Sequence, residues 1–251
     1  MSLFEELIED RKGDEEIVKS FEPKDSLSDQ IFEGSEGEFS MRSDIRKTLL
    51  KITDDFIDTL GVEFFIHDVV LTGSLSNYNW SQFSDVDLHI LIDFEESKYP
   101  ITLLKEFFDA KKNVWNEKHD IKIKGYDVEM YVQDVNEPHV SSGVYSILHN
   151  KWVVEPKEEN PNIDDRIILQ KGEEYMRLID NLVKNGDKKD TLTKIESLRK
   201  KIKTFRQSGL EQGGEYSYEN LTFKLLRRNG YIEKLLKLKT DITDKKLSIT
   251  Q

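Results

Sequence analysis

Two acidic residues at alternate positions, Asp85 and Asp87, carry the clearest chemical pattern in this chain, and ten residues separate them from a Gly73-Ser74 pair. Apolar residues fill the other positions of the same segment, namely Val86, Leu88, Ile90 and Ile92. Such alternation predicts a β-strand, so Asp85, Asp87 and His89 would project from one face. Carboxylates at the edge of an apolar strand are costly unless they bind a metal or another cation. The spacing of the two acids therefore favours a divalent-metal site. A histidine in the position of His89 is more often a packing or hydrogen-bonding residue.

The Gly73-Ser74 pair closes a short apolar segment, residues 68–71, that is predicted to be a strand. Glycine lets the backbone turn sharply and lets a ligand approach closely. A helix that began after the turn would present free backbone N–H groups, which favour phosphate, and Ser74 would add a hydroxyl. Many strands that bind no ligand end in the same pair. We therefore weigh a phosphate-binding turn against an ordinary strand end.

A third carboxylate would complete a two-metal site, and the predicted strand from Gly125 to Val132 supplies two candidates. Asp127 and Glu129 share one face of this strand because side chains alternate. We favour Glu129, which lies deeper in the strand, whereas Asp127 lies near its entrance. The alternative is that both acids cap the solvent side of an edge strand. Carboxylate ligands suit Mg²⁺ or Mn²⁺ rather than Zn²⁺.

Gly73-Ser74 followed by Asp85-Val86-Asp87 resembles the signature of the DNA polymerase β-like nucleotidyltransferase superfamily. Ser84, just before the first acid, also fits that signature, and the likeness extends over residues 45–135. The chain is most similar to the minimal nucleotidyltransferases and to uncharacterised phage-encoded members. Tyr78 is a departure, because minimal members often carry glycine there.

The resemblance implies a reaction and a set of residues for it. Asp85 and Asp87 would bind two Mg²⁺ or Mn²⁺ ions, and Glu129 would bind the ion nearer the acceptor hydroxyl. The residues that would hold the nucleotide phosphates are Gly73, Ser74 and Ser84. The enzyme would move a nucleoside monophosphate from an NTP, with ATP the commonest donor, to a hydroxyl and release pyrophosphate.

The sequence leaves the acceptor open among an RNA 3′ end, a protein hydroxyl and a small molecule. Two other functions also stay open. One is a pyrophosphokinase-type nucleotide synthetase on a related fold, and the other is a non-catalytic protein that binds NTP or serves in assembly.

Composition limits the class of protein. The 251 residues include 49 acids and 37 Lys and Arg, which gives a net charge of -12 and argues against a general nucleic-acid coating protein. No cysteine is present, which excludes disulfides, cysteine-based zinc sites and thiol nucleophiles. No apolar run approaches the roughly 20 residues of a membrane span, and the first residues do not resemble a signal peptide. We expect a cytoplasmic protein without a membrane partner, in the host cytoplasm if it is phage-encoded.

The order of predicted elements indicates an α+β fold, with a nucleotidyltransferase-like head of mixed sheet and helices and an all-α C-terminal half. The expected parts are a loosely ordered acidic segment at residues 1–41, the catalytic head at 42–138, a helical region at 139–240 and a flexible tail at 241–251. The acidic segment contains one helix candidate, at residues 4–18. The expected strands are residues 66–72, 85–93 and 121–133. The expected helices are residues 43–60, capped by Ser43-Asp44 and ended by Gly61, then 101–118, 142–149, 163–184, 190–207 and 217–238.

Two further groups of residues allow both a structural and a functional reading. The helical region from 184 to 239 is basic, with Lys200, Lys201, Lys203, Arg206, Lys224, Arg227 and Arg228. It is either a solvated helix surface or a surface that contacts a polyanion such as the triphosphate or RNA. Aromatic residues near the motifs either pack in the core, which we favour, or stack on a base, and these are Tyr78, Trp80, Phe83, Tyr145 and Trp152.

Overall fold

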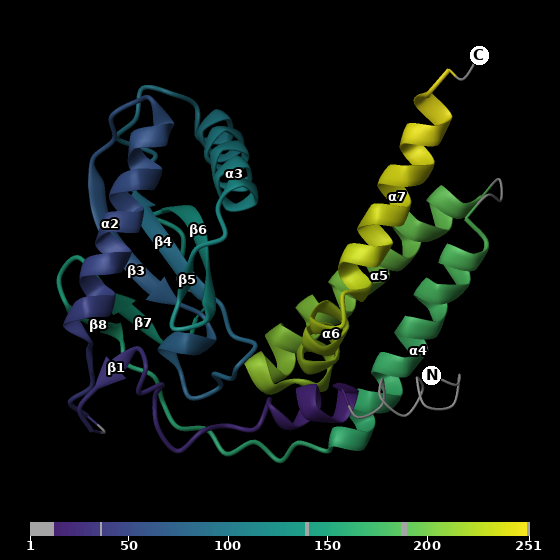
Figure 1. Ribbon diagram of the computed structural model, residues 1–251, viewed down its shortest axis with the longest axis horizontal. Coiled ribbons are helices and arrows are strands. Elements are labelled where there is room, and N and C mark those ends of the chain that lie inside the picture. The colour runs from purple at the N-terminus through teal and green to yellow at the C-terminus, as the bar shows by residue number, and fades with distance from the viewer. Residues whose placement is uncertain (1–12, 36, 139–140, 187–189, 250–251) are drawn as a thin grey trace. The chain divides into compact units, whose positions relative to one another are not determined.

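The chain is described here from a computed structural model that covers residues 13–35, 37–138, 141–186 and 190–249. Its contacts divide it into two compact units (Figure 1). One is the continuous segment 23–160, which we call the sheet unit. The other, which we call the helical unit, combines residues 13–22 with residues 161–249. The protein is therefore α+β, as expected.

The sheet unit is built on a six-stranded mixed sheet. Its strands are β3 (Ile66–Thr72), β4 (Val86–Ile92), β5 (Lys122–Ile123), β6 (Tyr126–Asp134), β7 (Val144–Ser146) and β8 (Lys151–Val154). They lie in the order β5-β6-β4-β3-β7-β8, and β4 and β6 form the parallel pair while the other neighbours are antiparallel. Two short strands, β1 (Phe32–Glu33) and β2 (Ser40–Met41), pair separately.

Helices α2 (Ser43–Leu60) and α3 (Ile101–Lys118) cover one face of this sheet. Leu49 and Phe56 of α2 and Phe108 of α3 belong to the same buried cluster as Leu88 and Ile90 of β4. Val86 completes the row on β4, and these three strand residues are at most 1% exposed. The alternation read from the sequence thus separates an apolar face, packed on the helices, from a face that carries Asp87 and His89.

Both helices have the bounds expected from the sequence, but α2 begins differently. Its N-cap residue is Arg42, without a side-chain hydrogen bond, so the expected Ser43-Asp44 cap is wrong. Gly61 ends the helix in the left-handed conformation at φ 72°, as expected.

The expected strand 121–133 is a hairpin. Lys124 and Gly125 both have positive φ, at 52° and 90°, and turn the chain between β5 and β6. The hairpin leaves most of β6 without a strand partner on that side. Asn116 of α3 fills part of this gap, because its side chain accepts from the Met130 N–H at 3.0 Å and donates to the Met130 carbonyl at 3.2 Å. This pairing fixes α3 against the backbone next to Glu129.

The expected helix at 142–149 is wrong. Residues 144–146 form β7, in which Tyr145 pairs with Leu71 and Ser146 with Val70. Hydrogen bonding to a strand distant in sequence outweighs any local helical tendency of this segment. The expected boundary after residue 138 therefore falls inside the sheet, and β7 and β8 belong to the sheet unit.

The helical unit contains α4 (Asp165–Lys184), α5 (Thr191–Gly213), α6 (Tyr218–Arg228) and α7 (Tyr231–Leu247), with a 3₁₀ turn, η2, at Gly214–Tyr216. The expected helix 217–238 is two helices, because Gly230 adopts φ 69° and breaks the run. The expected flexible tail is helical as far as Leu247.

Within its described residues, 13–35 and 37–41, the acidic N-terminal segment contains regular structure and buried side chains, whereas a loosely ordered segment was expected for 1–41. Residues 13–19 are helical, and Ile17, Val18 and Phe21 are buried. Arg228 of α6 donates to Ser20 Oγ at 2.7 Å and lies over the Phe21 ring at 4.8 Å. Residues 4–12 of the expected helix lie outside the described residues.

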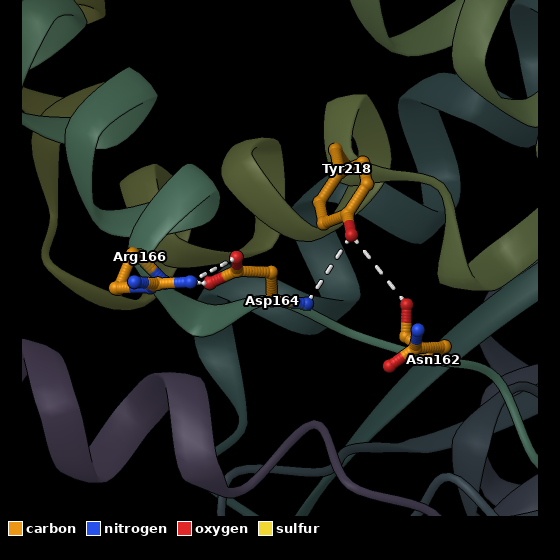
Figure 2. Close-up of polar contacts among 4 residues, drawn as sticks. All are labelled: Asn162, Asp164, Arg166 and Tyr218. Carbon is orange, nitrogen blue, oxygen red and sulfur yellow. Dashed lines mark hydrogen bonds and ion pairs between the residues drawn. The ribbon is translucent and has the colours of Figure 1, made fainter.

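The start of α4 shows how a local cap holds the helical unit together (Figure 2). Asp164 accepts from the Arg166 backbone N–H at 3.0 Å and from its guanidinium at 2.8 and 3.0 Å. Hydrogen bonds from the Arg166 side chain, and then from its backbone, lower the pKa of Asp164. The Tyr218 hydroxyl accepts from the Asp164 N–H and donates to the Asn162 carbonyl, which ties α6 to this cap.

Across the described ranges, no helix is both long and apolar enough to cross a membrane.

Replacing Asn116 with alanine leaves the Met130 N–H and carbonyl without their side-chain partners. We expect Asn116→Ala to destabilise the sheet unit by about 1–3 kcal/mol. Urea unfolding followed by tryptophan fluorescence measures this, because Trp80, Trp115 and Trp152 all lie in the sheet unit. Asn113→Ala is the matched control, since Asn113 is an exposed residue one turn earlier on α3, and we expect a change within about 0.5 kcal/mol. Equal effects of the two substitutions would contradict the role given to Asn116.

Candidate active site

The register of the sheet brings two of the three sequence-predicted acids side by side. Asp87 on β4 pairs directly with Glu129 on the parallel strand β6, and with Thr72 on the antiparallel strand β3. Paired residues of neighbouring strands are about 5 Å apart and point to the same face. Both acids are half-buried. Asp87 and Glu129 therefore share one edge of the sheet face that the helices leave uncovered.

Gly73 brings the turn against the same carboxylate. The residue follows β3 directly and adopts φ 74° and ψ -160°, a conformation that is essentially limited to glycine. A Cβ built there would overlap Oδ2 of Asp87 and would lie 3.0 Å from its Cγ. The absence of a side chain thus allows the Asp87 carboxylate to lie directly against the turn, as the proximity of the two motifs predicted.

Ser74 and Ser84 are joined by a hydrogen bond from Ser74 Oγ to Ser84 Oγ at 2.8 Å. Ser84 is only 5% exposed, and its hydroxyl also accepts from the Ser81 N–H at 2.9 Å. This buried hydroxyl can position Ser74 but has little surface for a ligand of its own. The helix expected after Gly73 is only a single 3₁₀ turn, η1 (Ser74–Ser76), so the backbone N–H array of a full helix is absent there.

A segment that sequence reasoning missed supports this turn. Ser141 Oγ accepts from the Gly73 N–H at 3.3 Å, and Ser76 Oγ donates to the carbonyls of Gly73 and Gly143 at 2.9 and 2.7 Å. Asn77 is hydrogen-bonded to Ser142. The Ser-Ser-Gly composition of residues 141–143 is typical of a turn and could have excluded the helix expected at 142–149.

Polar side chains continue along the face from Glu129. The Tyr131 hydroxyl donates to Glu129 Oε2 at 2.5 Å, which leaves Oε1 of the carboxylate for another ligand. His89 pairs in register with Tyr131, their rings 4.9 Å apart, and His89 Nδ1 lies 2.9 Å from Gln133 Oε1. His89 is thus engaged by packing and hydrogen bonding, the structural reading favoured from the sequence. Asp127 is exposed and pairs with Lys122.

Asp85, the first acid of the motif, lies outside the strand. It lies immediately before β4, two residues from Asp87, and is half-buried. Asp85, Asp87 and Glu129 do not form a group whose ligand atoms all lie within 4.8 Å of one another. Among the described residues the group of His, Asp or Glu that meets this distance is His67, Asp93 and Glu96.

Four of the five aromatic residues near the motifs pack in the core or against it. Tyr78 is 4% exposed, and its carbonyl accepts from the Lys24 N–H at 2.7 Å. Trp80 donates from Nε1 to the Ser26 carbonyl at 2.8 Å. Tyr145 and Trp152 both contact the ring of Phe32. Tyr78 stands at the position where minimal nucleotidyltransferases often carry glycine. Its packing anchors the loop between the two motifs.

No protein-family model matches this chain, and no curated protein matches its sequence.

The close approach of Gly73 and Asp87 can be tested by a double-mutant cycle. Gly73→Ala introduces a Cβ that overlaps Asp87, so we expect it to be less destabilising when Asp87 is also alanine, with a coupling of about 0.5–3 kcal/mol. Urea unfolding with tryptophan fluorescence measures the cycle.

Gly214 is the matched control for backbone strain. It has nearly the same dihedral angles, φ 67° and ψ -156°, but nothing lies within 4 Å of its Cβ position. Gly214→Ala should also lower the free energy of unfolding through backbone strain, but its effect should add to that of Asp87→Ala without coupling. Circular dichroism measures this unfolding. Additivity of Gly73→Ala with Asp87→Ala would contradict the contact.

Proposed function

We propose that this protein is a metal-dependent nucleotidyltransferase that transfers a nucleoside monophosphate from an NTP, with ATP the first candidate, to a hydroxyl acceptor. The observation that carries the proposal is the in-register pair Asp87 and Glu129, with the side-chain-free backbone of Gly73 against Asp87. The likeness in sequence described above and this geometry point to the same chemistry.

The topology also supports this proposal at the level of the fold. A glycine turn after β3, an acidic strand β4 antiparallel to it, and a third acid on β6 parallel to β4 make a compact mixed-sheet head with two helices on one face. We propose that residues 42–138 form a nucleotidyltransferase-like head, extended by β7 and β8.

The side chains fit Mg²⁺ or Mn²⁺. Asp85, Asp87 and Glu129 offer only oxygen ligands, which hard divalent cations prefer. Tyr131 holds one oxygen of Glu129 and so orients the other, as ligand-supporting residues commonly do. Two bound ions would neutralise charge on the phosphates and on the attacking and leaving oxygens.

The chain's own groups would then act as follows. The bare backbone at Gly73 lets the β- and γ-phosphates approach, and Ser74, positioned by Ser84, donates a hydroxyl to them. The acceptor oxygen forms a bond to the α-phosphorus while the bond to pyrophosphate breaks. In this proposal Glu129 also takes the proton that the acceptor hydroxyl loses.

For the acceptor, we propose a polyanion such as an RNA end that contacts the basic helical region 184–239. Part of this basic character is internal to the helical unit, because Lys201 lies over Tyr175 and Arg206 over Phe223. Lys224 differs from these. Burial lowers its pKa to about 8, Glu215 opposes this, and repulsion from Arg228, Arg227 and Arg206 adds to it. A bound anion would offset the repulsion among these four cationic groups beyond what Glu215 does.

Nucleotidyl transfer is tested with α-labelled NTPs, Mg²⁺ and a cell extract, followed by sorting of the labelled species by nuclease or protease sensitivity. We expect Asp87→Asn to lower Mg²⁺-dependent pyrophosphate release by roughly 10²-fold or more, since charge stabilisation at the reacting phosphate is lost. Asp127→Asn is the matched control, because Asp127 lies on the same strand as Glu129 and pairs with Lys122, and it should leave activity unchanged.

Two results would contradict nucleotidyl transfer and favour one of the two alternative functions. Label that is transferred only from γ-labelled NTP, with AMP released, indicates pyrophosphate transfer. NTP that binds and stays intact over many hours indicates a non-catalytic protein.

The polyanion contact predicts a dependence on pH. Lys224 is charged below its pKa of about 8 and neutral above it, so affinity for a single-stranded RNA oligonucleotide should fall as the pH rises through that value. Lys224→Arg keeps its charge and should remove this step while preserving affinity at neutral pH. Fluorescence anisotropy at constant ionic strength measures both, and identical pH profiles would contradict the contact.

A further inference from the structure

We propose that His67, Asp93 and Glu96 form a second metal site, selective for a borderline ion such as Zn²⁺, at the opposite end of β3 and β4 from Asp87. His67 is the second residue of β3, and Asp93 follows the last residue of β4. Because the two strands are antiparallel, with Ile66 paired to Ile92, these residues meet at the same end of the β3–β4 pair. One ligand atom from each of the three side chains lies within 4.8 Å of the others.

The imidazole of His67 is poised for a ligand. Its Nε2 is buried and has no hydrogen-bond partner among the described residues, although Glu96 Oε2 lies 3.5 Å away. A buried ring nitrogen without a partner is uncommon and calls for a physical explanation, which a shared cation supplies. The ring of Phe65 packs edge-on against the imidazole at 4.8 Å and limits its rotation.

Asp93 is held in a similar way by neighbouring groups. Its Oδ1 accepts from the Glu95 N–H at 2.8 Å and from Asn136 Nδ2 at 3.3 Å. Such outer hydrogen bonds orient a carboxylate and leave its second oxygen for a metal. The side chain of Glu96 is 63% exposed, against 31% for His67, and can rotate to complete the site.

The donor set distinguishes this site from the acids at the other end of β3 and β4. One imidazole nitrogen and two carboxylates suit Zn²⁺, whereas Mg²⁺ prefers oxygen ligands alone. Three protein ligands leave at least one coordination position of Zn²⁺ open. A pocket of about 390 Å³ lies alongside, lined by Asp93 and Glu96 together with Phe65, Lys98 and Tyr99. The open position would therefore face a space large enough for water or a small ligand.

The simpler interpretation is a surface ion pair between protonated His67 and Glu96, which would contribute little to stability. It predicts no selective response to Zn²⁺, so metal titration separates the two interpretations.

The test uses the full, tag-free chain in millimolar Mg²⁺, which occupies oxygen-only sites. Zn²⁺ is titrated while the imidazole nitrogens of the five histidines are followed by ¹⁵N NMR. We expect the His67 Nε2 signal, assigned by its loss in His67→Gln, to move to a metal-bound position at one equivalent. By calorimetry, Glu96→Gln should weaken Zn²⁺ binding by about 10-fold or more.

His149→Gln is the control, because His149 is exposed and lies outside the cluster, and it should bind Zn²⁺ like the wild type. A His67 signal that does not move in the wild-type protein overturns the proposal without reference to any variant. Equal Zn²⁺ affinity of wild type and His67→Gln also overturns it. Neither result bears on nucleotidyl transfer, which is measured separately with Asp87→Asn.

Discussion

The parallel pairing of β4 with β6 is the constraint on which the candidate site depends. It sets Asp87 opposite Glu129, and the burial of Leu88 and Ile90 against α2 and α3 prevents it from slipping. A shift of one residue would turn these apolar side chains away from the helices and bury Asp87 in the core, at a large cost. The same hydrophobic contacts that stabilise the sheet unit therefore also define where its acids lie.

The elements that the sequence predicted well are those whose pattern is local. The alternation around Asp87 fixed β4 within one residue, and the apolar stripe and Gly61 located α2. The errors concern residues whose conformation is decided by distant partners. Tyr145 is in a strand because β3 offers it a free edge. Residues 13–22 belong to the helical unit, where Arg228 contacts Ser20 and Phe21.

In the candidate site, too, the sequence predicted what depends on local pattern and missed what depends on distant contacts. Alternation placed Asp87 and Glu129 on faces that could meet, but the hydrogen bond from Tyr131, the support of Gly73 by Ser141 and the burial of Ser84 follow from tertiary packing. The cluster of His67, Asp93 and Glu96 was not predicted from the sequence for a related reason. Its ligands come from the start of one strand and from the loop after another, so only the antiparallel register brings them together.

The division of the chain has a consequence for its synthesis. The sheet unit is one uninterrupted segment, so the ribosome can release it to fold as soon as residue 160 has emerged. The helical unit, by contrast, is assembled from both sides of that insertion. Ile17, Val18 and Phe21 are translated before the sheet unit and must wait until α6 is translated before their apolar surface is covered. During this interval they are exposed to chaperones, to proteases and to premature self-association.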